Sequence, residues 1–255
     1  GKPPVAAAQG PLPIAHHPDV KRMLLTMKSQ TEALRAVALY TAWQLDLGAH
    51  HPDPAVRAAA QGRGDLLIPI VKGCSTEAGI ELASLGIQVH GGMGFVEETG
   101  AAQFARDVRV TAIYEGTNGI QAMDLTARKL MDGGDAAFRI LEEIQAGAEA
   151  AKASYPDLAE AVWQSVETLR ETTEWLVAQK DLTDRFAGAV PYLRAFARVL
   201  GGHVHLASAV SGDTSRARLA AFYIKRILPE HAGLLAHTRE GAADLMAISA
   251  DDLTA

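Results

Sequence analysis

A single cysteine, Cys74, stands in this chain of 255 residues. One thiol excludes a disulfide framework within the chain and is typical of a reducing compartment, so we expect a cytoplasmic protein. Cys74 lies in a helical pattern without a neighbouring histidine or second cysteine, which favours a buried packing role over a nucleophilic one. No apolar run reaches the roughly 20 residues that a membrane-spanning helix needs, so no membrane span is expected.

The chain also lacks any block of basic residues. Its formal net charge is −6, which makes nucleic acid an unexpected partner. With 48% hydrophobic and 21% charged residues, the chain can form one large or two small domains. Histidines occur in three close groups: His16-His17, His50-His51 and His203-Val204-His205. None has a Cys, Asp or Glu beside it at zinc-ligand spacing, so no metal site is predicted.

Strand signals are nearly absent, and the pattern predicts an all-α fold. We expect a Pro- and Ala-rich arm over residues 1–16, a helical bundle over 17–134 and a second helical domain over 135–255. The first half should contain helices at 17–48, at 53–86 with a kink at Pro69, from a Thr99 cap to about 110, and from Thr117 to about 132. The second half should contain helices at about 135–153, 156–180, 184–210 and 213–248, with kinks or breaks at Pro191 and Pro229.

The stretch from Gln88 to Gln121 differs from the alanine- and leucine-rich remainder. Its glycines allow backbone amides to approach a ligand closely. Glu115 lies just before a helix start that Thr117 or Asn118 should cap, and the free N–H groups of a helix start suit a phosphate. One carboxylate between two amide-rich turns suits a general base beside a bound cofactor. The alternative is an exposed loop glutamate in a capping turn.

Several motifs in this stretch together resemble the C-terminal half of acyl-CoA dehydrogenases. They are Gln88 to Phe95, Glu98-Thr99-Gly100, Arg106-Asp107-Val108-Arg109 and Ile113 to Gln121, with His17-Pro18-Asp19-Val20 upstream and Asp124-Leu125 and Arg128-Lys129-Leu130 downstream. Residues beyond about 140 resemble the extra helical domain of a longer subgroup. The resemblance implies that an N-terminal helical domain, a β-domain and the first bundle helix precede this segment, so we expect a fragment that is inactive alone.

The resemblance gives Glu115 the role of catalytic base. It implies that Glu115 removes a proton from the α-carbon of an acyl-CoA thioester while the β-carbon delivers hydride to N5 of FAD, leaving a trans-2-enoyl thioester. The thioester oxygen is expected to accept hydrogen bonds from the backbone N–H of Glu115 and from a ribityl hydroxyl of the flavin. An apolar pocket should raise the pKa of the glutamate against the opposing pull of the helix start.

Further site residues follow from the resemblance position by position. The FAD-binding candidates are Gln88, Val89, His90, Gly91 and Gly92 on the adenosine side, and Thr117, Asn118 and Gly119 beside the base. Tyr114 and Gly116 are expected to flank the acyl thioester, and Arg128 to face the CoA nucleotide. Many members carry a longer polar side chain at the position of Gly119, where this chain could offer only its backbone.

The resemblance also implies partners, and it leaves alternatives open. An electron-transfer flavoprotein is the expected electron acceptor, and self-association into a homo-oligomer is expected. An acyl-CoA oxidase would use the same base and flavin but pass electrons to oxygen. The isolated chain could instead be a non-catalytic helical assembly module.

Overall fold

The computed structural model describes residues 12–254. Most of the predicted arm, residues 1–11, lies outside the described part, and Ile14–His16 form a short 3-10 helix, η1. All regular structure between residues 12 and 254 is helical, which confirms the all-α prediction. Within that range, no helix combines the length and apolar character needed to cross a membrane.

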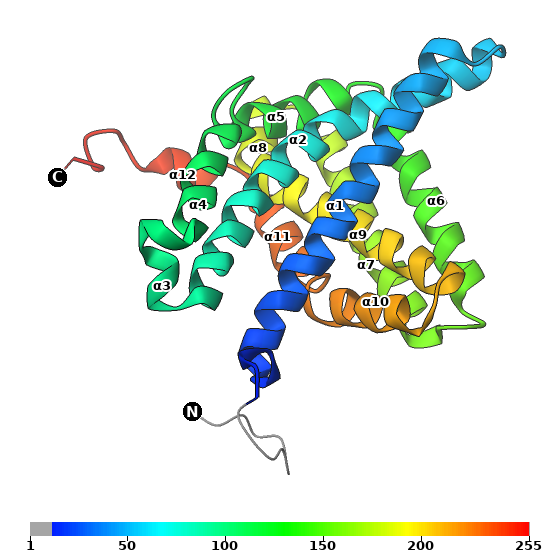
Figure 1. Ribbon diagram of the computed structural model, residues 1–255. Helices are drawn as coiled ribbons and strands as arrows, with labels where there is room; N and C mark the ends of the chain where they lie inside the picture. The colour runs from blue at the N-terminus through cyan, green and yellow to red at the C-terminus, as the bar shows by residue number, and fades with distance from the viewer. Residues whose placement is uncertain (1–11, 255) are drawn as a thin grey trace.

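Two long helices, α1 (Pro18–His50) and α2 (Pro54–His90), form a hairpin along the first half (Figure 1). Both begin with a proline in the first turn, where its missing N–H costs nothing. Asp53 caps α2 by accepting a hydrogen bond from the N–H of Ala55 at 2.8 Å. The prediction that α2 ends at Gly86 was wrong, because the backbone turns left-handed only at Gly91, with φ of 62°.

Short helices follow α2 in sequence. They are α3 (Gly92–Phe95), η2 (Glu97–Thr99), α4 (Ala101–Arg109), η3 (Val110–Ala112), α5 (Asn118–Thr126) and η4 (Arg128–Leu130). The predicted Thr99 cap was wrong: the Thr99 hydroxyl donates to the carbonyl of Met93 at 2.6 Å, and Gly100, with φ of 75°, precedes α4. The helix expected to run to about 132 stops at Thr126, because Ala127 leaves the helical region with φ of −95° and ψ of −82°.

The second half contains more helices than predicted. They are α6 (Asp135–Ala151), α7 (Pro156–Ala178), α8 (Leu182–Ala187), α9 (Ala189–Ser211), α10 (Thr214–Arg226), α11 (Glu230–Thr238) and α12 (Ala243–Ala247). Gly188 separates α8 from α9, and a Cβ there would lie 2.5 Å from the carbonyl oxygen of Thr238. Pro229 marks the predicted break before α11, whereas Pro191 lies in the first turn of an unbroken α9.

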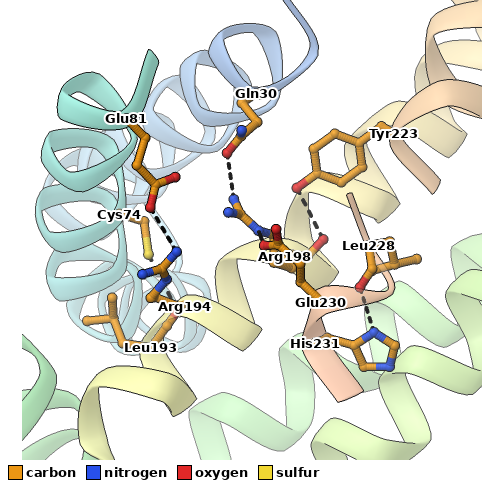
Figure 2. Close-up of polar contacts among 10 residues, drawn as sticks. All are labelled: Gln30, Cys74, Glu81, Leu193, Arg194, Arg198, Tyr223, Leu228, Glu230 and His231. Atoms are coloured by element: carbon orange, nitrogen blue, oxygen red, sulfur yellow. Dashed lines mark hydrogen bonds and ion pairs between the residues drawn. The ribbon is translucent and has the colours of Figure 1, made fainter. Parts of the chain in front are cut away.

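Helix α9 runs through the middle of the molecule and packs against helices of both halves (Figure 1). One hydrophobic core includes Leu67 of α2, Leu125 of α5 and Phe196 of α9. Polar contacts add to this packing (Figure 2). Arg198 donates to Gln30 of α1 and to Glu230 of α11, each at 2.7 Å. Helix α9 therefore fixes the position of the α1–α2 hairpin, whose second helix packs against α5 beside the candidate site.

Candidate functional site

Glu115 occupies the link between η3 and α5 in a strained backbone conformation. It has φ of 53°, and among residues 12–254 it is the one non-glycine residue with positive φ. Gly116 follows with φ of 86°. The left-handed region costs a residue with a Cβ roughly 1–2 kcal/mol, and such strain persists where the surroundings impose it. The strain therefore coincides with the residue that the sequence singles out.

The start of α5 fixes the C-terminal side of this link. Thr117 is the N-cap residue, as the sequence allowed, and its hydroxyl oxygen accepts a hydrogen bond from the N–H of Ile120 at 3.3 Å. Asn118 is the first helical residue. On the same side, the side-chain amide of Gln121 donates to the carbonyl oxygen of Glu115 at 3.4 Å.

Three polar residues of α2 hold Asn118 by its side chain. Its amide oxygen accepts hydrogen bonds from Lys72 and from Thr76, each at 3.0 Å, and its amide nitrogen donates to Glu77 at 2.8 Å. Lys72 also donates to the carbonyl oxygen of Gly116 at 2.5 Å. Helix α2 thus anchors the backbone on the C-terminal side of Glu115.

Sequence reasoning missed Lys72, Thr76 and Glu77. They lie in a part of α2 where Leu66, Leu67, Ile70 and Ala78 are buried. The sequence did contain one indication of their role, because three polar residues stand in a helix segment whose other residues enter the core. Their partner, however, lies more than 40 positions further along the chain, and no local pattern identifies it.

The backbone N–H groups of Glu115 and Gly116 donate to no other group among the described residues. The Glu115 carboxylate likewise has no hydrogen bond or ion pair within residues 12–254. The residue is exposed, and neighbouring Tyr114 is 52% exposed. The described residues therefore form one open wall with a free carboxylate and two free donors, and they do not build the expected apolar enclosure.

The glycine-rich turn follows the C-terminal end of α2. Gln88, Val89 and His90 belong to the last helical turn, so the turn itself begins only at Gly91. A Cβ at Gly91 or Gly92 would meet nothing within 4 Å, so their bare backbone borders open space. The Nδ1 atom of exposed His90 lies 2.7 Å from the carbonyl oxygen of Gly86.

Gly94 plays a different part in the same turn. It is buried, and a Cβ on it would lie 2.2 Å from the carbonyl oxygen of Ile87. Only glycine therefore allows α3 to fold back onto the end of α2. Nearby, Arg106 of α4 makes two hydrogen bonds to the carboxylate of Glu97, at 3.0 and 2.7 Å, which fixes α4 against η2.

The predicted site residues fall into two places on this chain. Lys72, beside the Glu115 wall, and Gln88 are about 24 Å apart along α2 at roughly 1.5 Å per residue. Tyr114, Gly116, Thr117, Asn118 and Gly119 therefore share one place with Glu115, and Gln88 to Gly92 occupy another. Arg128 lies in η4, is 71% exposed in its side chain and pairs with Asp124 at 2.5 Å.

Each half of the chain matches a family model of known proteins. Residues 6–131 match the family model described as "Acyl-CoA dehydrogenase, C-terminal domain". Residues 140–249 match the model described as "Acetyl-CoA dehydrogenase C-terminal like".

Curated relatives extend the likeness over most of the chain. The 3-methylmercaptopropionyl-CoA dehydrogenase of Ruegeria pomeroyi is 43% identical over an alignment of 225 residues that covers 85% of this chain and 38% of the relative. The broad-specificity linear acyl-CoA dehydrogenase FadE5 of Mycobacterium tuberculosis is 32% identical over 254 residues, covering 89% of this chain and 41% of the relative. The chain thus spans about two fifths of the length of these relatives.

Solved structures share the fold. ACDH-11 of Caenorhabditis elegans, determined in complex with C11-CoA, aligns with a TM-score of 0.69 and 21% identity over 81% of this chain and 36% of its own. An acyl-CoA dehydrogenase of Bacillus anthracis, complexed with FAD, aligns with a TM-score of 0.63 and 17% identity over 97% of this chain and 45% of its own.

Proposed function

Because this chain belongs to the acyl-CoA dehydrogenase family, whose members are FAD-linked oxidoreductases, we propose that it is the C-terminal helical part of such an enzyme. The complete enzyme would oxidise an acyl-CoA thioester to the trans-2-enoyl thioester, with Glu115 as the base. The observation that carries this proposal is the held, strained backbone at Glu115, with its carboxylate and two N–H groups free.

The chain's own residues would perform the proton transfer. The Glu115 carboxylate would accept the α-proton, and the free N–H of Glu115 would donate to the thioester oxygen as negative charge develops there. A fixed donor stabilises an enolate because it needs no reorientation during the reaction. Lys72 and Asn118 would keep this donor in place through Gly116 and the first turn of α5.

Each of the two places would accommodate one portion of a bound FAD. The open backbone at Gly91 and Gly92 leaves room for an adenosine portion, and a Cβ at Gly119 would meet only the Thr117 hydroxyl oxygen, at 3.8 Å. The Asn118 side-chain oxygen already accepts two hydrogen bonds from α2 and its amide nitrogen donates to Glu77, so beside its backbone it would offer the cofactor one remaining N–H. The bound flavin would supply the hydride acceptor.

The acyl-CoA would lie against the same wall. Tyr114 and Gly116 would border the thioester, and the exposed guanidinium of Arg128 would face the CoA phosphates. The named activities of the relatives range from a methylmercaptopropionyl-CoA to linear acyl-CoA thioesters, so family membership alone does not define the acyl group.

The enclosure of Glu115 would come from parts that this chain does not contain. Large apolar side chains between Met93 and Ile120 are exposed, among them Phe95, Phe104 and Ile113. They could be covered by the domains that the resemblance implies, or by another copy in a homo-oligomer. Such cover would exclude water from the carboxylate. A cytoplasmic electron-transfer flavoprotein would then accept the electrons.

The decisive experiment uses the chain joined to the N-terminal domains that the resemblance implies. The purified protein should be yellow, and an acyl-CoA should bleach the flavin under anaerobic conditions. Glu115→Gln should retain FAD but lose most of the bleaching. Glu98→Gln changes another exposed glutamate of the same region and should bleach like the wild type.

Each other outcome has a defined meaning. Normal bleaching by Glu115→Gln would refute the assignment of the base. Oxygen uptake with formation of hydrogen peroxide would identify an acyl-CoA oxidase. A joined protein that binds no flavin would favour the non-catalytic assembly module.

A further inference from the structure

A pocket of about 260 Å³ lies between α1, α6 and α9, and none of the proposed catalytic or cofactor residues lines it. Its buried apolar walls are Val37, Ile140, Ile144 and Leu200. Its other lining residues, all less buried, are Tyr40, Glu143, His203, Val204 and Ala207. Small-molecule sites typically combine such apolar walls with a few polar groups.

His203 supplies a polar group without a partner in this pocket. No hydrogen bond joins either ring nitrogen to another residue between 12 and 254. No wholly buried side-chain polar atom in that range lacks a partner, so each ring nitrogen of His203, a residue that lines this pocket, retains some accessible surface. Burial lowers the pKa of His203 below its ordinary value, against the opposing effect of Glu143, which favours the neutral imidazole at pH 7.

Gly147 makes room for this ring. A Cβ at Gly147 would lie 2.8 Å from Cε1 and 3.1 Å from Nδ1 of His203. Glycine inside a helix costs roughly 0.5–1 kcal/mol relative to alanine. Gly147 therefore makes α6 slightly less stable, but it leaves the space in which the imidazole of His203 lies against the helix beside the pocket.

The other polar side chains that line the pocket already have hydrogen-bond partners. Glu143 of α6 accepts from Nε of Arg63 at 2.8 Å and from the hydroxyl of Tyr40 at 3.2 Å. Burial raises the pKa of Tyr40 to about 12, so it remains a donor. With the carboxylate paired and the imidazole neutral, the pocket offers no uncompensated charge to an ion.

We propose that this pocket is a binding site for a small, uncharged and mostly apolar molecule that carries one hydrogen-bonding group, such as a hydroxyl. The apolar part would contact Ile140, Ile144 and Leu200, and the hydroxyl would bond to His203. An engineered apolar cavity of about 150 Å³ binds benzene, so a pocket of this volume has room for a molecule of that size. The site does not depend on the proposed dehydrogenase activity.

Three probes of similar shape test the ligand class: benzyl alcohol, toluene and benzylammonium. Each is titrated into this chain by calorimetry or ligand-observed NMR. Benzyl alcohol should bind roughly fivefold more tightly than toluene, the ratio that one typical hydrogen bond contributes. Benzylammonium should bind the most weakly. Equal affinity for all three, or binding of none, would overturn the proposal.

Variants locate the binding. Ala207→Phe places an aromatic ring at an exposed lining position and should abolish binding, whereas Val210→Phe, exposed on the same helix outside the pocket, should not. His203→Leu should reduce the preference for benzyl alcohol over toluene to about one, because it removes the hydrogen-bonding partner. Gly147→Ala should weaken this preference by displacing the ring while the histidine remains. Unchanged affinity in Ala207→Phe would refute the location.

The same titration on Glu115→Gln separates this site from the proposed function. Binding of benzyl alcohol should be unchanged in that variant. A loss of binding there would show that the probe occupies the Glu115 wall instead, and would overturn the assignment to the α1–α6–α9 pocket.

Discussion

Lys72 and Asn118 are joined by a hydrogen bond of 3.0 Å between the ammonium of one and the side-chain oxygen of the other. The same ammonium reaches the carbonyl oxygen of Gly116, so one side chain of α2 holds both the link after Glu115 and the start of α5. A rigid helix therefore defines the position of the only strained non-glycine residue in the described part of the chain.

Replacing Lys72 by methionine should loosen this link while preserving the length of the side chain. In this chain, amide hydrogen exchange at Ile120 and Gln121, whose N–H groups bond to Thr117, should become faster, because opening of this turn no longer breaks the bonds of Lys72 to Gly116 and Asn118. Lys225→Met, at an exposed position of α10, is the matched control and should leave that exchange unchanged. Equal exchange in Lys72→Met and the wild type would show that α2 does not hold the link.

The same variant can be examined in the enzyme joined to its N-terminal domains. A donor displaced at Glu115 should lower kcat by roughly tenfold or more with a smaller change in KM, because it acts mainly on developing charge. Lys72→Arg retains a cationic donor and should recover part of the rate. A change confined to KM would indicate a role in substrate binding instead.

Glu115→Gly should stabilise the folded chain. Glycine adopts φ of 53° without the clash of a Cβ, and relief of this strain should add roughly 1 kcal/mol to the free energy of unfolding. The flexibility of glycine in the unfolded chain offsets part of that gain. Denaturant unfolding of Glu115→Gly and Glu115→Ala separates the effects, since alanine keeps the strain. No difference between the two variants would show that the strain has little energetic weight.

Arg198→Leu should lower the free energy of unfolding by about 1–3 kcal/mol, because it leaves the buried amide of Gln30 without its partner. Arg194→Leu is the matched control from the same helix. Its partner Glu81 is 39% exposed in its side chain and regains water, so a loss below about 1 kcal/mol is expected. Similar losses in both variants would contradict a special role for the Arg198 contacts.

Helix starts could be read from the sequence better than helix ends. The helices predicted from 53 and from 213 begin there, with Asp53 and Asp213 as their N-cap residues. Gly86 and Gly91 look alike in sequence, but Gly86 continues the helix and only Gly91 has a positive φ, which the neighbouring residues alone do not distinguish. Glu115 could be singled out from its local pattern and from resemblance. The contacts from Lys72, Thr76 and Glu77 that hold its link depend on how α2 packs beside α5 and could not.

Stability should fall as the pH is lowered from about 7 to 5. Burial lowers the pKa values of His203, His205 and His231 in the folded chain below the ordinary value of 6.5. Below pH 6.5 the unfolded chain therefore binds protons that the folded chain does not bind. Each such histidine reduces the free energy of unfolding by up to about 1.4 kcal/mol per pH unit until it is protonated in the folded chain too.

Denaturant unfolding at intervals across this pH range measures the slope. His203→Leu should make the slope shallower, whereas His50→Leu, at an exposed position, should leave it unchanged. A flat profile between pH 7 and 5 would mean that the folded chain accepts these protons as readily as the unfolded one, and it would remove the neutral His203 on which the α1–α6–α9 pocket depends.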